Sequence, residues 1–159
     1  MSNPLLNNPL ANKPLVNNPK AVLGFLGRAL SFELSAVQQY IALAKLMELR
    51  GMTSAGDKFR QEAGEEMQHV ERIIGRMLAL GGAPNASSLR ATHLDGSLPE
   101  LMQQCKRFEL EIVGFYTQAV RHCATSQDDD NRIFFAELLK EEQAHADSFD
   151  SWWQQTVGS

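Results

Sequence analysis

Apolar residues recur at intervals of three and four positions along most of the chain, which is the spacing of one face of an α-helix. Gly51 can end the first such stretch in a left-handed conformation, and the Gly81-Gly82-Ala83-Pro84 run ends the second. No alternating strand pattern competes with this periodicity. The spacing predicts four helices, over about residues 20–50, 53–80, 97–124 and 129–153.

The connections between these predicted helices are unequal in length. Residues 81–98 have no strong period, and a loop of this length is uncommon inside a compact domain. It is long enough to run from one end of a helical bundle to the other. Ser97-Leu98-Pro99-Glu100 is a capping box that starts the third helix. We therefore predict an all-α four-helix bundle of two hairpins, with a long crossover between helices 2 and 3.

Residues 1–19 differ in composition from the rest of the chain. Proline recurs there every five residues, and a leucine follows each of the first three prolines, at Leu5, Leu10 and Leu15. Proline fixes φ and biases the preceding residue towards extended conformations, so we predict an extended Asn/Pro/Leu-rich arm over 1–19 and a bundle domain over 20–156. The arm is either a loose tail or a segment whose leucines dock on a neighbouring subunit or a partner.

Glutamate and histidine residues form a pattern that occurs twice. Glu66-Met67-Gln68-His69 and Glu142-Gln143-Ala144-His145 are both Glu-x-x-His, and residues three apart share one face of a helix. Another glutamate precedes each motif by 33 residues, at Glu33 and Glu109. A single Glu-x-x-His is common on solvated helices, whereas two copies with equal offsets indicate a dinuclear metal site.

The two tyrosines of the chain belong to the same repeat. Tyr40 follows Glu33 by seven residues, and Tyr116 follows Glu109 by seven. This spacing corresponds to about two helical turns. Each tyrosine is therefore expected to hydrogen-bond a ligand carboxylate, or to supply an electron to the site.

The six acidic and imidazole side chains can converge on the bundle axis. Buried carboxylates repel one another, and two divalent cations would cancel four negative charges. The mixed oxygen and nitrogen ligands suit Fe(II), Mn(II) or Zn(II), and iron is favoured because carboxylates tolerate Fe(III) and open positions remain for dioxygen. Matching the ligand pattern of di-iron bundles gives bridging, terminal and imidazole roles. These roles fall on Glu66 and Glu142 (bridging), Glu33 and Glu109 (terminal), and His69 and His145 (one iron each).

Bulk composition excludes several other classes of protein. The 159 residues suit one domain, and a formal net charge of -4 provides no basic surface for nucleic acid. The longest uncharged apolar run, residues 21–27, is too short to span a membrane, and no secretory leader is visible. Cys105 and Cys123 are separated by roughly 27 Å on one helix, so they cannot form a disulfide with each other. We expect reduced thiols and a cytoplasmic protein.

On these residues the chain resembles the bacterioferritins of the ferritin-like superfamily, over about residues 20–153. The stretches that carry the resemblance are Glu33–Tyr40, Glu65–His69, Leu80–Asn85 and Glu141–His145. The resemblance implies a ferroxidase at a di-iron site within one subunit. Such a site oxidises Fe(II) with dioxygen or peroxide, and a hollow cage stores the ferric product. A ferredoxin-type reductant is a candidate partner.

The same resemblance gives Met67 a role. In bacterioferritins the methionine directly after the second-helix glutamate is an axial ligand of haem, and two such methionines bind one haem across a two-fold axis. One residue past Glu66 is about 100° around the helix, so Met67 should point out of the bundle. The alternative is a methionine of the core or of a dimer interface. No Cys-x-x-Cys-His motif is present, so any haem would be non-covalent.

One departure from the family affects the expected assembly. Only 14 residues follow His145, so we expect no fifth helix. In the family that helix surrounds the four-fold pores of the 24-subunit cage. We therefore favour a 12-subunit cage, as in Dps-like and miniature bacterioferritins, with 24 subunits as the alternative.

Other readings of the pattern remain open. A rubrerythrin-like peroxide reductase usually carries paired Cys-x-x-Cys motifs, and this chain has none. In a Dps-like protective cage the metal ligands usually come from two subunits, and no lysine-rich tail for DNA is present. A fourth reading is cargo of a larger shell, with the arm as its address.

Overall fold

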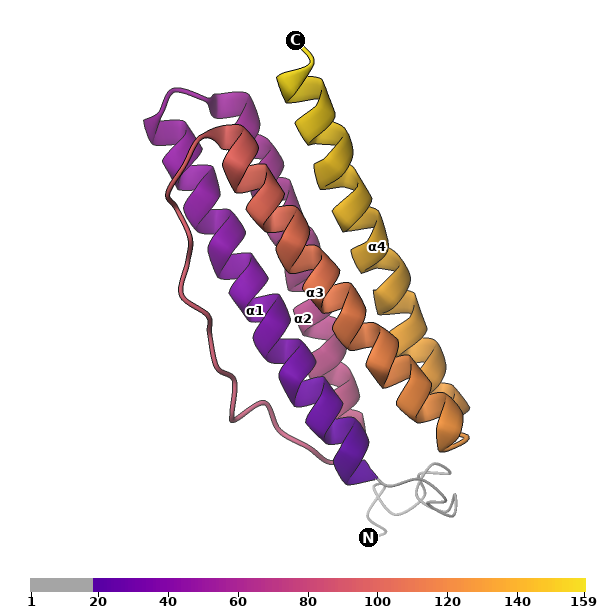
Figure 1. The fold of residues 1–159 in the computed structure, drawn as a ribbon. Coiled ribbons are helices and arrows are strands. Elements are labelled where there is room, and N and C mark those ends of the chain that lie inside the picture. The colour runs from indigo at the N-terminus through magenta and orange to yellow at the C-terminus, as the bar shows by residue number, and fades with distance from the viewer. Residues whose placement is uncertain (1–18) are drawn as a thin grey trace, which may run out of the picture.

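The computed structural model describes residues 19–159, which form four long helices (Figure 1). The helices are α1 (Pro19–Leu49), α2 (Thr53–Ala79), α3 (Leu98–Thr125) and α4 (Asp129–Val157). No strand occurs in this part of the chain, so the predicted all-α four-helix fold is confirmed. The predicted arm lies outside the described residues, except for Pro19, which is the first residue of α1. The fourth helix extends beyond its expected end near Trp153.

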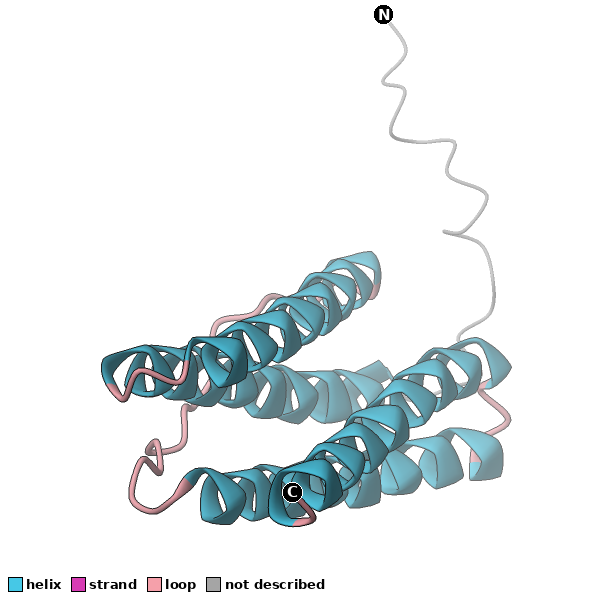
Figure 2. Cartoon of the chain, turned by 90° about the horizontal axis from the view of Figure 1, so that it is seen from above, coloured by secondary structure: helices cyan, strands magenta, loops and turns pink. Residues whose placement is uncertain are grey.

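The helices are arranged as two hairpins. The main packing partner of α1 is α2, and that of α3 is α4. Seen from above, the four helices lie as two pairs (Figure 2). The crossover between α2 and α3 carries the chain along the side of α1 to the opposite end of the bundle, as predicted (Figure 1). None of the four helices is long and apolar enough to cross a membrane.

The sequence signals at two helix ends are confirmed, and a third end has a side-chain cap. Gly51 takes a φ of 73° after α1, which is the left-handed conformation that glycine adopts without steric cost. The Glu100 carboxylate accepts a hydrogen bond of 2.7 Å from the Ser97 N–H at the start of α3. Asp128 accepts from the Asn131 N–H and so caps α4. These contacts fix where α1 ends and where α3 and α4 begin.

The crossover has no secondary structure, and polar side chains of α1 hold it in place. Three side chains of α1, spaced four residues apart, accept hydrogen bonds from the backbone of the crossover. The spacing places all three on one face of α1. The bonds run from the Ser88 N–H to Ser31 Oγ (3.0 Å), from the Arg90 N–H to Ser35 Oγ (3.0 Å) and from the His93 N–H to Gln39 Oε1 (2.9 Å). Side-chain oxygens therefore replace the backbone partners that a helix or sheet would supply.

The hydrophobic core consists of two separate clusters. One lies at the end of the bundle where α1 begins and contains Leu26, Ile73 and Phe135. The other lies at the opposite end and contains Leu43, Phe59 and Phe149. The middle of the bundle, between the two clusters, is occupied by polar side chains. The apolar clusters provide the burial that stabilises the fold on either side of this polar layer.

Candidate metal centre

The six side chains predicted from the sequence meet in this middle layer. Each of the four glutamates is 0% exposed, His69 is 2% exposed and His145 is 7% exposed. Every helix contributes: Glu33 comes from α1, Glu66 and His69 from α2, Glu109 from α3, and Glu142 and His145 from α4. Charged residues are rarely buried without partners. Their concentration at one level of the bundle therefore needs a specific explanation.

The six residues form two overlapping groups of potential metal ligands. In each group one ligand atom per residue lies within 4.8 Å of the others. Glu66 and Glu142 belong to both groups, which is the arrangement expected of bridging carboxylates. The first group adds Glu33 and His69, and the second adds Glu109 and His145.

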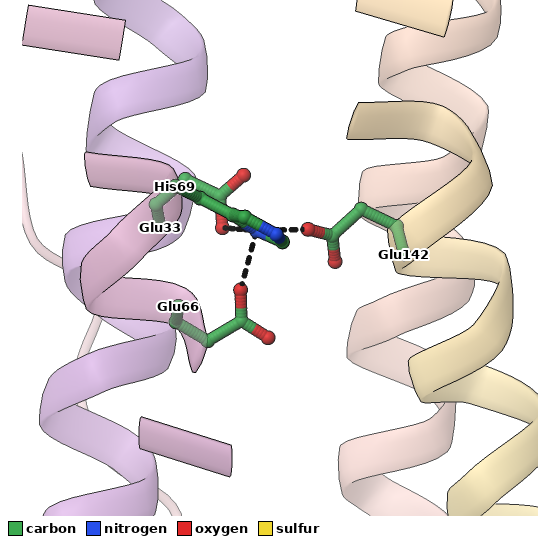
Figure 3. Close-up of side chains that lie close together, drawn as sticks. All are labelled: Glu33, Glu66, His69 and Glu142. Carbon is green, nitrogen blue, oxygen red and sulfur yellow. Dashed lines mark ion pairs between the residues drawn. The ribbon is translucent and has the colours of Figure 1, made fainter. Parts of the chain in front are cut away.

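His69 illustrates how the first group converges. Its Nδ1 lies 2.9 Å from Glu66 Oε2 and 2.7 Å from Glu142 Oε1, which belongs to the other hairpin. Glu33 Oε2 is 3.7 Å away from the same nitrogen. Figure 3 shows these carboxylates converging on the His69 ring from three helices.

The second group mirrors the first. His145 Nδ1 lies 2.8 Å from Glu66 Oε1 and 3.8 Å from Glu142 Oε2. The two imidazole rings are stacked, with centroids 5.5 Å apart and an angle of 15° between their planes. The duplicated sequence therefore folds into a site with approximate two-fold symmetry.

Many polar atoms of this layer lack a hydrogen-bond partner. Such atoms are rare in folded proteins, since each costs the free energy of its lost hydration. Eight of the ten unpartnered atoms found in residues 19–159 belong to the six residues, and they include both oxygens of Glu66 and of Glu142 and the Nδ1 of each histidine. Each Nδ1 lies 2.7–2.9 Å from a carboxylate oxygen, but these contacts do not have the angles of a hydrogen bond. Carboxylate oxygens and imidazole nitrogens are ligands for first-row divalent metals. The donor set therefore fits two metal ions.

The pKa values of the layer reflect its burial. Desolvation and the neighbouring carboxylates raise the pKa of Glu66 and of Glu142 to about 7, and raise that of Glu109 well above its usual range. Burial lowers the pKa of His145, but contact with the Glu66 carboxylate outweighs it and raises the value to about 10. Without metal, protons and imidazolium groups must therefore balance the buried negative charge.

Both tyrosines hydrogen-bond a glutamate of the opposite hairpin. The Tyr40 hydroxyl on α1 donates to Glu109 on α3, and the Tyr116 hydroxyl on α3 donates to Glu33 on α1. Burial raises the pKa of each phenol, so both stay protonated and act as donors. The sequence predicted that the tyrosines contact carboxylates, but it did not predict this exchange between hairpins.

Two functional residues were missed in the sequence. Glu141 Oε2 lies 2.8 Å from His69 Nε2, and Glu65 Oε2 lies 3.0 Å from His145 Nε2. These carboxylates fix the outward nitrogen of each ring, which leaves Nδ1 directed at the centre. The sequence signal for these two residues was the second glutamate that directly precedes each Glu-x-x-His motif. A residue adjacent to a metal ligand lies at the edge of the helix face that carries the ligand.

Only one of these outer carboxylates is held by an arginine. Arg72 places its Nη1 2.9 Å and 2.8 Å from the two oxygens of Glu141. Glu65 instead accepts a 3.1 Å hydrogen bond from Gln61. The two halves of the site therefore match in their inner residues and differ in the residues around them.

Met67 lies on the outer surface of α2 and is 39% exposed. One turn earlier on the same helix, a Cβ added at Gly64 would meet no atom within 4 Å. Ile41 of α1 is also exposed, at 43%. The orientation of Met67 agrees with the expectation that it points out of the bundle.

The thiols of Cys105 and Cys123 are free and buried, and neither belongs to a metal-ligand group found in residues 19–159.

Comparison with known proteins identifies the family. The ferritin-like domain model matches residues 24–157. The bacterioferritin of Rhodobacter capsulatus is 32% identical over 130 residues, which cover 82% of this chain and 81% of that protein. The chain belongs to the bacterioferritin family. Another member, from Mycolicibacterium paratuberculosis, is 29% identical over 82% of each chain.

A solved bacterioferritin structure has the same fold. The Rhodobacter capsulatus protein superimposes with a TM-score of 0.81 at 30% identity, covering 86% of this chain and 85% of that one. That structure is described as having a metal-free dinuclear site and a haem iron in a crystallographic special position.

Metal binding should raise the thermal stability of the bundle. A ligand that binds only the folded state at about 100 times its dissociation constant stabilises that state by about 2.7 kcal/mol. We expect Mn(II) to raise the Tm of the metal-free protein in differential scanning calorimetry. Glu142→Gln should remove most of this rise, because it removes a ligand shared by both groups.

Glu71→Gln is the matched control for this measurement. Glu71 is exposed on α2 and belongs to no metal-ligand group found in the structure, so the rise should be preserved. An equal rise in wild type and Glu142→Gln would contradict metal binding at this centre.

Proposed function

We propose that this bacterioferritin-family chain is a ferroxidase that oxidises Fe(II) at the central layer and stores the ferric product. The observation that carries the proposal is the pair of overlapping ligand groups that share Glu66 and Glu142. The unpartnered atoms of those groups support two cations at the same level of the bundle. Family membership supports iron as the metal.

The roles of the residues follow from their positions. Glu66 and Glu142 bridge two Fe(II) ions, Glu33 and Glu109 each bind one, and each histidine supplies Nδ1. Binding displaces the protons that the carboxyl groups otherwise carry, since their pKa values are raised by burial. Tyr40 and Tyr116 keep the outer glutamates oriented by donating to them.

The electrons balance with either oxidant. Two Fe(II) ions release two electrons on becoming Fe(III). Hydrogen peroxide accepts two electrons and two protons to give two waters, and dioxygen accepts the same number to give hydrogen peroxide. The apolar clusters above and below the site exclude bulk water, which strengthens the electrostatic interactions within it.

Two alternatives give different measurements. A rubrerythrin-like protein would reduce peroxide without accumulating a mineral, so oxidation by peroxide and by dioxygen should be compared along with iron retained per subunit. A Dps-like cage would bind metal between subunits. All six candidate ligands here come from one chain, which favours the intrasubunit site.

Glu66→Ala should abolish rapid Fe(II) oxidation. The substitution removes a bridging carboxylate, so neither metal position keeps its full ligand set. The rate of ferric absorbance growth in a stopped-flow instrument measures this, and far-UV circular dichroism checks that helical content is retained. Glu71→Ala on the exposed face of α2 is the control and should oxidise at the wild-type rate. Unchanged oxidation in Glu66→Ala would refute the assignment.

We also propose a non-covalent haem between two subunits, which the Met67 side chain of each subunit would hold. The exposed side chain of Met67 and the open space beside Gly64 support a flat group against this face of α2. Haem at this position would supply a one-electron carrier between a ferredoxin-type reductant and the stored iron.

Met67→Leu should remove the haem without affecting Fe(II) oxidation. Leucine preserves the apolar volume but has no sulfur to ligate iron. The Soret absorbance of the purified protein measures haem content, and the initial rate of Fe(II) oxidation is the internal control. Wild-type haem content in the variant would disprove the ligand role.

Assembly and location complete the proposal. We propose a homo-oligomeric cage in the cytoplasm, with 12 subunits favoured and 24 as the alternative, and with no role in binding membranes or nucleic acid. The two buried free thiols support a reducing compartment. Native mass spectrometry should give the mass of twelve chains of 17.7 kDa. A mass of twenty-four chains would replace the smaller cage with the larger one.

A further inference from the structure

A groove runs between the first half of α1 and the crossover, which lies beside that helix in Figure 1. Its volume is about 730 Å³. One wall is the crossover over residues 82–90, and the other is α1 from Leu23 to Ser35. The apolar side chains in its lining include Leu23, Leu30, Phe32, Met77, Pro84 and Leu89. Leu89 is 54% exposed, so the described residues leave apolar surface in water there.

Two glycines form part of the α1 wall. A glycine inside a helix costs about 0.5–1 kcal/mol relative to alanine, so it usually answers a need for close approach. A Cβ added at Gly24 or Gly27 would meet no atom within 4 Å. Nothing in residues 19–159 therefore requires glycine at these positions. A second stretch of backbone lying in the groove would explain both glycines, because the absence of a side chain lets that backbone approach α1 closely.

The crossover is held to α1 only along part of its length. Its contacts with the serine and glutamine side chains of α1 begin at Ser88. Residues 84–87 are exposed, and within the described chain the only backbone–backbone hydrogen bond of residues 83–87 joins the Asn85 N–H to the Ala83 carbonyl. Backbone donors and acceptors on this wall are therefore available to an extended segment.

The segment best suited to the groove is the chain that precedes α1. It joins the helix at Pro19, one turn before Leu23, so it is present at high effective concentration. It carries a single charged residue, Lys13, among its first 18 residues. An extended chain rises about 3.1 Å per residue, so Leu10 and Leu15 would be about 16 Å apart. The nine steps along the helix from Leu23 to Phe32 span about 14 Å of α1.

We propose that residues 8–16 fold back along α1 and occupy this groove in their own subunit, with Leu15 beside Gly24 and Leu10 near Phe32. The leucines cover the apolar lining, and the asparagines of the segment bond the exposed backbone of the crossover. This contact fixes the crossover against the part of α1 that leads into Glu33.

Disulfide trapping in the assembled full-length protein tests the placement. Both native cysteines are buried, so cysteines introduced at the surface can be oxidised selectively. Leu15→Cys combined with Gly24→Cys should form an intramolecular disulfide under mild oxidation, seen as a faster-migrating monomer on a non-reducing denaturing gel. Leu15→Cys combined with Gly75→Cys is the control. Gly75 is a helical glycine of α2 with open surroundings at the same end of the bundle.

Each outcome bears on the proposal. At least tenfold faster trapping at Gly24 than at Gly75 supports it. Equal rates at the two positions overturn it. A disulfide between two chains also overturns it, because the groove would then hold the arm of a neighbouring subunit.

Hydrogen exchange provides a second measurement that needs no introduced cysteine. Deleting residues 2–18 should accelerate hydrogen exchange of the backbone amides in 85–90 by about tenfold. The docked arm would cover these amides, and without it the crossover opens to solvent more often. The double substitution Leu10→Ser and Leu15→Ser should reproduce the effect, whereas Leu5→Ser, outside the groove, should not. Unchanged exchange after the deletion would overturn the proposal.

Discussion

Repulsion among four carboxylates buried at one level of the bundle is the constraint on which the rest of the structure depends. Each of them is 0% exposed, and burial alone would favour protonation. The two imidazoles offset part of the charge, as the raised pKa of His145 shows. The remaining excess of negative charge makes burial of the metal-free site unfavourable. The apolar clusters at both ends of the bundle must therefore supply the free energy that keeps the helices packed around it.

The polar layer also joins the two hairpins. Helix packing is extensive within each hairpin and slight between α1 and α3. The hydrogen bonds of the site instead connect one hairpin to the other. They join Tyr40 to Glu109, Tyr116 to Glu33, and His69 to Glu141. Charge-assisted hydrogen bonds of this kind are directional and strong when buried. The site therefore sets the alignment of the hairpins, and the alignment in turn sets the distances between the ligands.

The sequence predicted most of the fold and the inner part of the site because both rest on local periodicity. The spacing of Glu66 and His69 places them on one face whatever the rest of the chain does. The capping box at Ser97 and the glycine at Gly51 likewise act within a few residues. The contact between Tyr116 and Glu33 depends on how one hairpin lies on the other, which no local spacing specifies. The same is true of Glu65, whose role depends on where His145 of α4 arrives.

The repeat is faithful where the ligands are and diverges where the site meets solvent. Arg72 holds Glu141, but Ser148 stands at its equivalent position in the second half, so Glu65 has no arginine. Beside Glu65 lies Glu62, whose buried oxygen lacks a hydrogen-bond partner and whose pKa is raised by burial. Because the inner ligands are identical in type, a difference in affinity between the two metal positions must originate in these outer residues. The half that contains His145 has the looser and more acidic surroundings. The asymmetry of this site is therefore encoded in residues that flank the motifs and not in the motifs themselves.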